Sequence, residues 1–214
     1  MSPPKPRSEG GRRPAMGRTA SAPADAPVPS LRLRVTLLNV EPPVWREVQV
    51  PVDLTFAQLH TILQAAMGWE DDHLHEFEVG EVHIGPPAPQ DFFAGDKPLQ
   101  DERKTRLGDI LEGRRKFRYW YDFGDDWWHE IAIRRGALGE YGEPRLLAGE
   151  GACPPEDCGG PYGYADLRQA LADPKHPEHR ELREWAGDFD PQRFDFDRAA
   201  KRVAKAVRRP GGRK

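Results

Sequence analysis

The sequence has no serine after Ser30, only two cysteines and no long apolar run, and each of these shortages excludes a class of protein. A nucleophilic serine is excluded from most of the 214 residues. Two cysteines do not make the disulfide scaffold of a small secreted protein. No stretch approaches the roughly 18 apolar residues of a membrane-spanning helix, and no apolar segment follows Arg12 and Arg13 as an export signal requires. We therefore expect a cytoplasmic protein without membrane contact.

The formal net charge of -3 is distributed unevenly along the chain. Residues 1–30 carry a net charge of +3 and residues 198–214 a net charge of +8. The middle retains 19 of the 32 basic and 33 of the 35 acidic residues, which gives it a net charge of -14. An acidic body is poorly suited to bind nucleic acid through its folded surface. Nonspecific nucleic-acid contact is therefore expected only from the basic C-terminal helix and the tails.

The composition predicts one folded domain between two tails. Residues 1–30 and 208–214 are basic and poor in bulky apolar side chains, so we expect both to be disordered. Residues 31–207 are expected to form a single domain. Within it, alternating apolar and polar residues predict three β-hairpins, over residues 31–51, 73–85 and 116–135.

The helix signals complete the predicted fold. Thr55 and Gln58 form a capping-box pattern that opens a helix, and Gly68 ends it. Residues 86–104 are expected to form a long loop, and the segment "RLGDIL" a short helical turn. Three further helices follow residue 163, so the expected order is ββ-α-ββ-ββ-α-α-α. This order predicts an α+β fold, in which helices pack against an antiparallel-rich sheet built from three hairpins.

Two histidines lie close together in "WEDDHLHEFEVG", residues 69–80. On a strand, His73 and His75 share one face about 7 Å apart, which is close enough for both to bind one metal ion. The alternative interpretation is that one histidine caps the strand and the other is hydrogen-bonded in the core.

The segment "YDFGDDWWHE", residues 121–130, carries the second group of polar residues. His129 shares the face of Trp127 and of the apolar residues that follow, so it is expected to point toward a packed layer. Asp125 and its neighbours occupy a tight turn, where aspartate is favoured because it bonds nearby backbone N–H groups. The surrounding acids disfavour stacking of the tryptophans on nucleic-acid bases, so packing is the better interpretation.

The segment "CPPEDCGGPYGY", residues 153–164, forms the third group. Two thiolates bind zinc well, but a zinc centre needs two more ligands, for which His75 and His129 are the best candidates. The alternatives are free thiols, a labile disulfide, or a nucleophile pair of one cysteine with His129. The predicted metal ligands are His75, His129, Cys153 and Cys158, with zinc as the possible cofactor.

The three segments together predict one polar pocket, and no phosphate-binding loop, dinucleotide fingerprint or complete catalytic motif accompanies it. The residues predicted to line this ligand pocket are His73, His75, Asp122, Asp125, His129, Glu156 and Asp157.

Five motifs in order resemble one known family: "PPVWREVQVP", "WEDDHLHEF", "YDFGDDWWHEI", "PPEDCGGPYGY" and "DFDPQRFD". They are similar to the plasmid pRiA4b ORF-3-like family, which includes passenger "TnpR-like" proteins of some insertion elements. The resemblance covers residues 31–205 and implies an α+β fold and a mobile-element setting, but no reaction. Serine recombinase chemistry is excluded, because Ser30 is the last serine of the chain.

These observations support three hypotheses about function. The first is a non-enzymatic binding or accessory protein with a polar His/Asp/Cys-lined pocket, because the body is acidic and no catalytic signature is complete. The second is a metal-dependent hydrolase or nuclease, in which the histidines hold a divalent ion and a carboxylate assists a bound water. The third is a structural zinc that ties the cysteine loop to the sheet without catalysis.

Overall fold

A computed structural model describes residues 29–87, 99–134 and 142–207. The predicted tails, residues 1–30 and 208–214, lie outside the described residues, apart from Pro29 and Ser30. The elements in chain order are β1 (Ser30–Leu37), β2 (Trp45–Pro51), α1 (Phe56–Met67), β3 (His75–Val79), β4 (Val82–Gly85), β5 (Leu99–Asp101), α2 (Leu107–Leu111), β6 (Lys116–Tyr121), β7 (Trp127–Arg134), β8 (Arg145–Glu150), α3 (Gly160–Ala172), α4 (His179–Ala186) and α5 (Phe196–Ala206).

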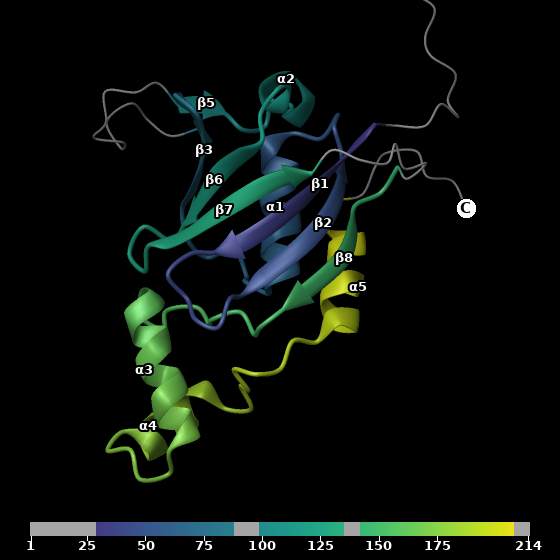
Figure 1. The fold of residues 1–214 in the computed structure, drawn as a ribbon. Helices are drawn as coiled ribbons and strands as arrows, with labels where there is room; N and C mark the ends of the chain where they lie inside the picture. The colour runs from purple at the N-terminus through teal and green to yellow at the C-terminus, as the bar shows by residue number, and fades with distance from the viewer. Residues whose placement is uncertain (1–28, 88–98, 135–141, 208–214) are drawn as a thin grey trace, which may run out of the picture.

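All eight strands belong to one sheet, in the order β5-β4-β3-β6-β7-β1-β2-β8 (Figure 1). Neighbouring strands are antiparallel except β4 and β5, which are parallel. The mixed α+β architecture with a mostly antiparallel sheet confirms the predicted fold class.

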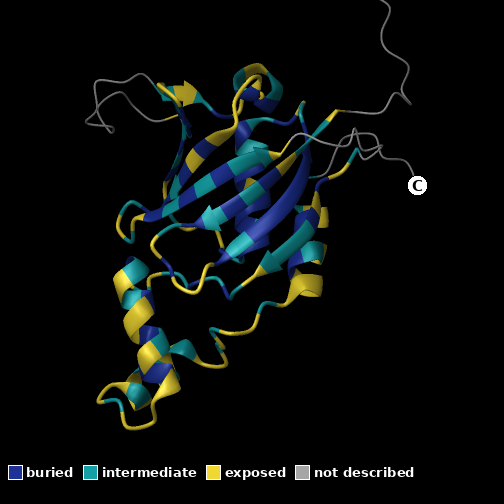
Figure 2. Ribbon diagram, in the orientation of Figure 1, coloured by how far each residue is buried: buried dark blue, intermediate teal, exposed yellow. Residues whose placement is uncertain are grey.

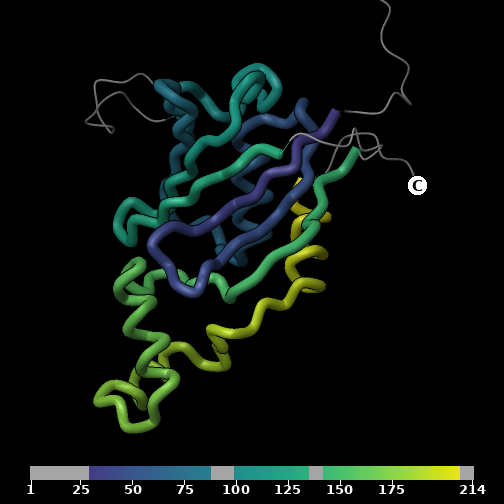
Figure 3. The backbone as a smooth tube through the Cα atoms, viewed as in Figure 1, coloured from purple at the N-terminus to yellow at the C-terminus, as the bar shows by residue number. Residues whose placement is uncertain are grey.

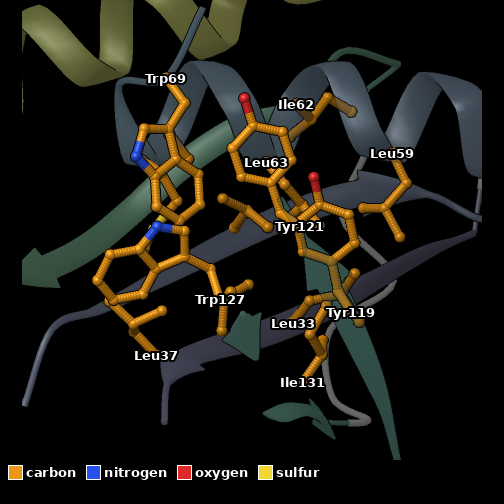
Figure 4. Packing of buried hydrophobic residues seen from close by; sticks show 14 of the residues in the cluster. Leu33, Leu37, Leu59, Ile62, Leu63, Trp69, Tyr119, Tyr121, Trp127 and Ile131 are labelled. Carbon is orange, nitrogen blue, oxygen red and sulfur yellow. The ribbon is translucent and has the colours of Figure 1, made fainter. Parts of the chain in front are cut away.

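Helix α1 forms where the sequence predicts it. Thr55 accepts a hydrogen bond from the backbone of Gln58, whose side chain bonds back to the Thr55 N–H, so the capping box is complete. The helix ends at Gly68, whose φ of 115° suits glycine. Its apolar stripe packs on the sheet, where Leu59 and Leu63 lie over side chains of β6 and β1 (Figure 4).

The helices occupy two places relative to the sheet. Helix α5 contacts both α1 and β8, so these two helices cover the same side of the sheet (Figure 1). Helices α3 and α4 contact each other and extend beyond one end of the sheet, and the chain then returns along the sheet to α5 (Figure 3). Burial follows this arrangement: the central strands are buried, whereas α4 has no buried residue (Figure 2).

Two strands, β5 and β8, were not predicted. β5 lies inside the expected loop 86–104 and has only three residues, too few to show a period of two. β8 contains Gly149, where an added Cβ would lie 2.6 Å from the ring of Phe194. The sheet is therefore not built from three hairpins alone, and the predicted element order lacks these two strands. The short helical turn expected at "RLGDIL" forms α2.

A buried arginine of β2 joins several elements. Arg46 is 1% exposed, and its Nε donates to the carbonyl of Ala66 in α1 at 3.0 Å. Its terminal nitrogens donate to the carbonyls of Trp45 and Glu150 at 2.8 Å each and of Gly151 at 2.9 Å. Burial lowers the pKa of Arg46 to about 10, so the side chain stays charged at neutral pH.

The same guanidinium lies over an aromatic ring from the segment before α5. Its central carbon is 3.7 Å from the ring centroid of Phe194, a cation–π contact. Gly149 makes this contact possible, since a side chain there would collide with both Phe194 and Arg46. Arg46 therefore fixes α1, the end of β8 and the approach to α5 against one another.

Within the described ranges, no helix combines the length and the apolar character that crossing a membrane requires.

We expect Arg46→Met to lower the free energy of unfolding by about 3–5 kcal/mol, because it leaves four carbonyls without their donor in a buried place. The measurement is urea denaturation followed by tryptophan fluorescence. Arg34→Met is the matched control: Arg34 also stacks on an aromatic ring, that of Trp45 at 3.7 Å, but it is not buried. Its loss should cost about 1 kcal/mol or less, and equal losses in the two variants would contradict the role given to Arg46.

Candidate functional site

Three carboxylates surround one nitrogen of His73. Its Nε2 lies 3.2 Å from Oδ1 of Asp157, 3.6 Å from Oδ2 of Asp122 and 3.9 Å from Oε2 of Glu156. These residues come from three segments: the turn between α1 and β3, the end of β6, and the loop between β8 and α3. We call them the His73 cluster. It unites four of the seven residues predicted to line the ligand pocket.

Asp122 is oriented by its own turn. Its Oδ1 accepts hydrogen bonds from the backbone N–H groups of Gly124 at 2.9 Å and Asp125 at 3.2 Å. Its backbone N–H donates to the carbonyl of Leu74 at 2.9 Å. With Oδ1 occupied in this way, Oδ2 is left to face His73.

Glu156 is held by one of its two oxygens. Its Oε1 accepts from the hydroxyl of Tyr121 and from the backbone N–H of Glu70, both at 3.0 Å. Burial raises the pKa of Tyr121, so the phenol keeps its proton and remains a donor. Burial also raises the pKa of Glu156, against the two hydrogen bonds and the neighbouring His73, which lower it.

The loop that carries Glu156 and Asp157 is attached to the sheet at two points. The indole N–H of Trp69 donates to the carbonyl of Pro154 at 3.0 Å. Asp125 accepts from the backbone N–H of Gly159 at 3.1 Å through its Oδ2. Asp125, another predicted pocket residue, therefore positions the loop instead of joining the His73 cluster.

Two atoms of the cluster lack partners. Nε2 of His73 and Oε2 of Glu156 are both buried and make no hydrogen bond among the described residues. Asp157 differs, because its side chain is 75% exposed and leaves one side of the cluster open to solvent. The ligand atoms of His73, Asp122 and Asp157 all lie within 4.8 Å of one another, which is close enough for one metal ion.

His75 belongs to a separate network under α1. Its ring stacks on that of His60, with centroids 3.4 Å apart and planes inclined by 6°. His75 Nε2 lies 2.7 Å from Glu102, and His60 Nε2 lies 2.6 Å from Asp71. The predicted convergence of His73 and His75 on one ion is not formed, because β3 begins at His75 and His73 lies in the preceding turn.

The hydrogen bonds around His60 form a complete chain. Burial, and then the neighbouring His75, lower the pKa of His60 to about 4, so its ring is neutral at neutral pH. The Nε2–H then donates to Asp71, and Nδ1 accepts from the hydroxyl of Tyr119 at 2.8 Å. That hydroxyl accepts from Gln64 at 3.0 Å. Both His60 nitrogens are thus satisfied, and parallel stacked rings do not aim their lone pairs at one ion, so we interpret this network as structural.

Sequence reasoning missed His60 and Gln64 as members of a polar network. The available signal was their spacing: they lie four residues apart within the apolar stripe of α1, where a polar pair needs partners. Their partners are Asp71, in the turn after α1, and Tyr119 on β6, which no local pattern connects with the helix.

His129 and the two cysteines do not join either group. His129 is fully buried on β7; its Nδ1 donates to the carbonyl of Tyr119 at 3.2 Å, and its ring meets the edge of Trp69. Both cysteines are free thiols, and burial raises the pKa of Cys153 and raises that of Cys158 to about 12. Neither thiol is therefore an activated nucleophile.

The predicted zinc ligands are not brought together. Among the described residues, no three of His75, His129, Cys153 and Cys158 place ligand atoms within 4.8 Å of one another. The reason is that β3 and β7 send their histidines into the packed layer under α1, whereas the cysteines lie in the loop before α3. Glu76, Glu78 and His83 on β3 and β4 also place possible ligand atoms within 4.8 Å of one another, but there His83 already pairs with Glu76.

The sheet, its helices and the His73 cluster define an α+β protein with a polar site where the ends of strands meet two loops. The family described as plasmid pRiA4b ORF-3-like protein matches residues 29–198, and the chain belongs to this family. The family predicted from the five motifs is therefore confirmed, whereas its connection with insertion elements stays a prediction.

Two relatives support this assignment. The uncharacterized protein y4hQ of Sinorhizobium fredii is 45% identical over 178 residues, which cover 81% of this chain and 90% of the relative. The crystal structure of MM3350, a protein of unknown function from Methanosarcina mazei Go1, is similar with a TM-score of 0.68 and 37% identity. That similarity covers 79% of this chain and 97% of MM3350.

We expect stability to fall as the pH falls from 6.5 toward 4, partly because of His129. Burial lowers the pKa of His129 to about 4, whereas an unfolded histidine titrates near 6.5. The unfolded chain therefore binds more protons than the folded chain in this window. The contribution of the neutral His129 to the free energy of unfolding is complete above pH 6.5 and falls by up to about 1.4 kcal/mol per pH unit as the pH decreases.

The measurement is urea denaturation of the wild type and His129→Phe between pH 6.5 and 5. The variant should show a shallower dependence of unfolding free energy on pH. His176→Gln, in the connection between α3 and α4, controls for the loss of a histidine outside the core. An unchanged slope in His129→Phe would contradict the neutral, buried state.

Proposed function

We propose that the protein binds a divalent cation through His73, Asp122, Glu156 and Asp157. The observation that carries the proposal is that His73 Nε2 and Glu156 Oε2 are buried, make no hydrogen bond among the described residues and face each other across 3.9 Å. Buried polar atoms are nearly always paired. A cation between them satisfies both atoms and compensates the carboxylates that converge on the same place.

The donor set indicates which cations fit. Three carboxylates and one imidazole are ligands that Mn²⁺, Mg²⁺ and Zn²⁺ accept, whereas closed structural zinc sites are rich in cysteine. The spacings of 3.2–3.9 Å from the imidazole nitrogen to the carboxylate oxygens suit ligands of one ion, whose bonds are about 2.0–2.2 Å long. Among the described residues, neither Cys153 nor Cys158 belongs to a group of three possible ligands within 4.8 Å, which supports an ion held without the cysteine loop.

The test is titration of chelator-treated protein with Mn²⁺ by isothermal calorimetry. We expect one ion per chain, and a dissociation constant raised about tenfold or more in Asp122→Asn, which removes the charge of one ligand. Asparagine tolerates the positive φ of 54° at this position, so the fold should be retained.

Asp126→Asn is the matched control. Asp126 lies in the same turn with a φ of 59°, but its carboxylate accepts from the indole of Trp128 and is not part of the His73 cluster. This variant should bind Mn²⁺ as the wild type does. If the folded wild-type protein binds none of Mn²⁺, Mg²⁺ and Zn²⁺, the proposal fails.

A metal-dependent hydrolase is a second candidate function, and the exposure of Asp157 favours it. An ion with one side open keeps exchangeable water, which is the nucleophile in metal-assisted hydrolysis. A closed coordination shell would instead favour a structural ion.

The number of waters on bound Mn²⁺ distinguishes these two uses of the ion. We expect water proton relaxation to be enhanced when Mn²⁺ binds, as it is when at least one exchangeable water remains on the ion. Asp126→Asn should show the same enhancement. A stoichiometric Mn²⁺ complex without enhancement would indicate a closed, structural site and would contradict the hydrolase.

Two further parts of the sequence-based interpretation stay predictions. The accessory role in a mobile element depends on the family resemblance alone. Nonspecific contact with nucleic acid depends on the charge of the C-terminal helix and tails. Neither follows from the geometry of the His73 cluster.

A further inference from the structure

A pocket of about 520 Å³ lies between α4, α5 and the turn that follows α1. This volume falls within the range of small-molecule pockets. Its wall is formed on one side by Trp69 and the loop with Glu156, and on the other by Trp185, Arg198 and Arg202. We call it the arginine pocket. Glu156 also belongs to the His73 cluster, so the two sites are neighbours.

Three arginines line this pocket, and the charge of Asp195 acts on one of them, Arg202, by raising its pKa against the larger effect of burial. Within the described part of the chain, no ion pair involves Arg193, Arg198 or Arg202. Arg198 and Arg202 are four residues apart on α5, so they project from the same face of the helix. Like charges at this spacing repel each other. Burial and then the charge of Arg198 lower the pKa of Arg202.

Arg202 is placed at the pocket by the end of α1. Gly68 leaves the space for its guanidinium, because a Cβ there would lie 2.9 Å from Nη2. The Nε of Arg202 is buried and has no hydrogen-bond partner. An unpaired, partly buried guanidinium beside a second one is the arrangement that a phosphate or carboxylate stabilises, since the planar fork donates two parallel hydrogen bonds.

Four acids also line the pocket, Glu70, Asp72, Glu156 and Asp195, and two of them accept hydrogen bonds from other groups. Asp195 caps α5 by accepting from the backbone N–H of Arg198 at 2.9 Å. Glu156 accepts from Tyr121 and from the backbone of Glu70. Among the described residues, none of these four acids forms an ion pair with an arginine of α5, and Nε of Arg202 keeps a free donor.

The pocket also offers an aromatic surface on which a flat apolar group can lie. Trp185 is 50% exposed on α4 and lines the pocket together with Phe189 and Phe194. An exposed indole stacks on planar rings, and such stacking contributes on the order of 1–3 kcal/mol per nucleic-acid base.

We propose that the arginine pocket binds a small anion that carries a flat ring, of the nucleoside monophosphate class. Arg198 and Arg202 hold the phosphate, and Trp185 stacks on the ring. The inference does not depend on the proposed cation, since neither the arginines nor Trp185 belong to the His73 cluster.

The test is calorimetric titration of the whole chain with AMP, with adenosine and inorganic phosphate as partial probes. We expect AMP to bind more tightly than either partial probe. Arg198→Gln with Arg202→Gln should weaken AMP binding about tenfold or more, because two charge-assisted contacts are lost. Trp185→Ala should weaken AMP binding while leaving phosphate binding unchanged.

Lys201→Gln with Lys205→Gln is the matched control. This double variant also removes two positive charges from α5, but at positions outside the arginine pocket. AMP binding should therefore be retained. Equal weakening in the two double variants would show a diffuse attraction and overturn the site. Arg198 is exposed, so Arg198→Gln alone provides a folded variant if the double variant unfolds.

The cation proposal and the arginine-pocket proposal can be contradicted independently of each other. AMP binding should persist in Asp122→Asn and in the presence of a chelator. If AMP binds only with Mn²⁺ and intact Asp122, its phosphate sits on the cation and the arginine pocket is not its site. If adenosine or phosphate binds as tightly as AMP, or if AMP does not bind the folded protein, the proposed ligand class is wrong.

Discussion

The position of both candidate sites depends on the buried guanidinium of Arg46. A charged group removed from water must have its hydrogen bonds satisfied, and here four carbonyls satisfy it. Those carbonyls belong to α1, β2 and the start of the loop that leads to Glu156. Its stacking on Phe194 also fixes the approach to α5. One side chain thereby sets the relative placement of the loop that completes the His73 cluster and the helix that carries the arginine pocket.

His60 and His73 differ in how completely their ring nitrogens are paired and in the charges that surround them. An unpaired nitrogen alone does not mark a site, since Nε2 of the core residue His129 is also buried without a hydrogen bond. His60 has a partner for each ring nitrogen and lies in a chain of bonds that needs no further atom. His73 has carboxylates around Nε2 but no hydrogen bond to it. Because burial of an unsatisfied polar atom costs free energy, the second arrangement is the one that calls for a ligand.

The two candidate sites share the wall that contains Glu156. On one side of it carboxylates gather around an imidazole, and on the other side unpaired guanidinium groups lie beside an exposed indole. A cation and an organic anion attract each other, so their neighbouring sites are chemically compatible. Trp69, which is part of this wall, stacks on Tyr121 with ring centroids 4.8 Å apart and donates to the backbone of the loop at Pro154.

The sequence by itself determined the α+β class, the capped helix α1, the family and four members of the His73 cluster, because local periodicity, capping and short motifs carry that information. Only the tertiary structure decided which polar residues meet. His75 is two residues from His73, yet it turns under α1 toward Glu102, because the strand begins between them. Trp185 of α4 and the arginines of α5 line one pocket. The cysteines stay apart from the histidines. Such encounters are set by packing of distant segments, which no local pattern records.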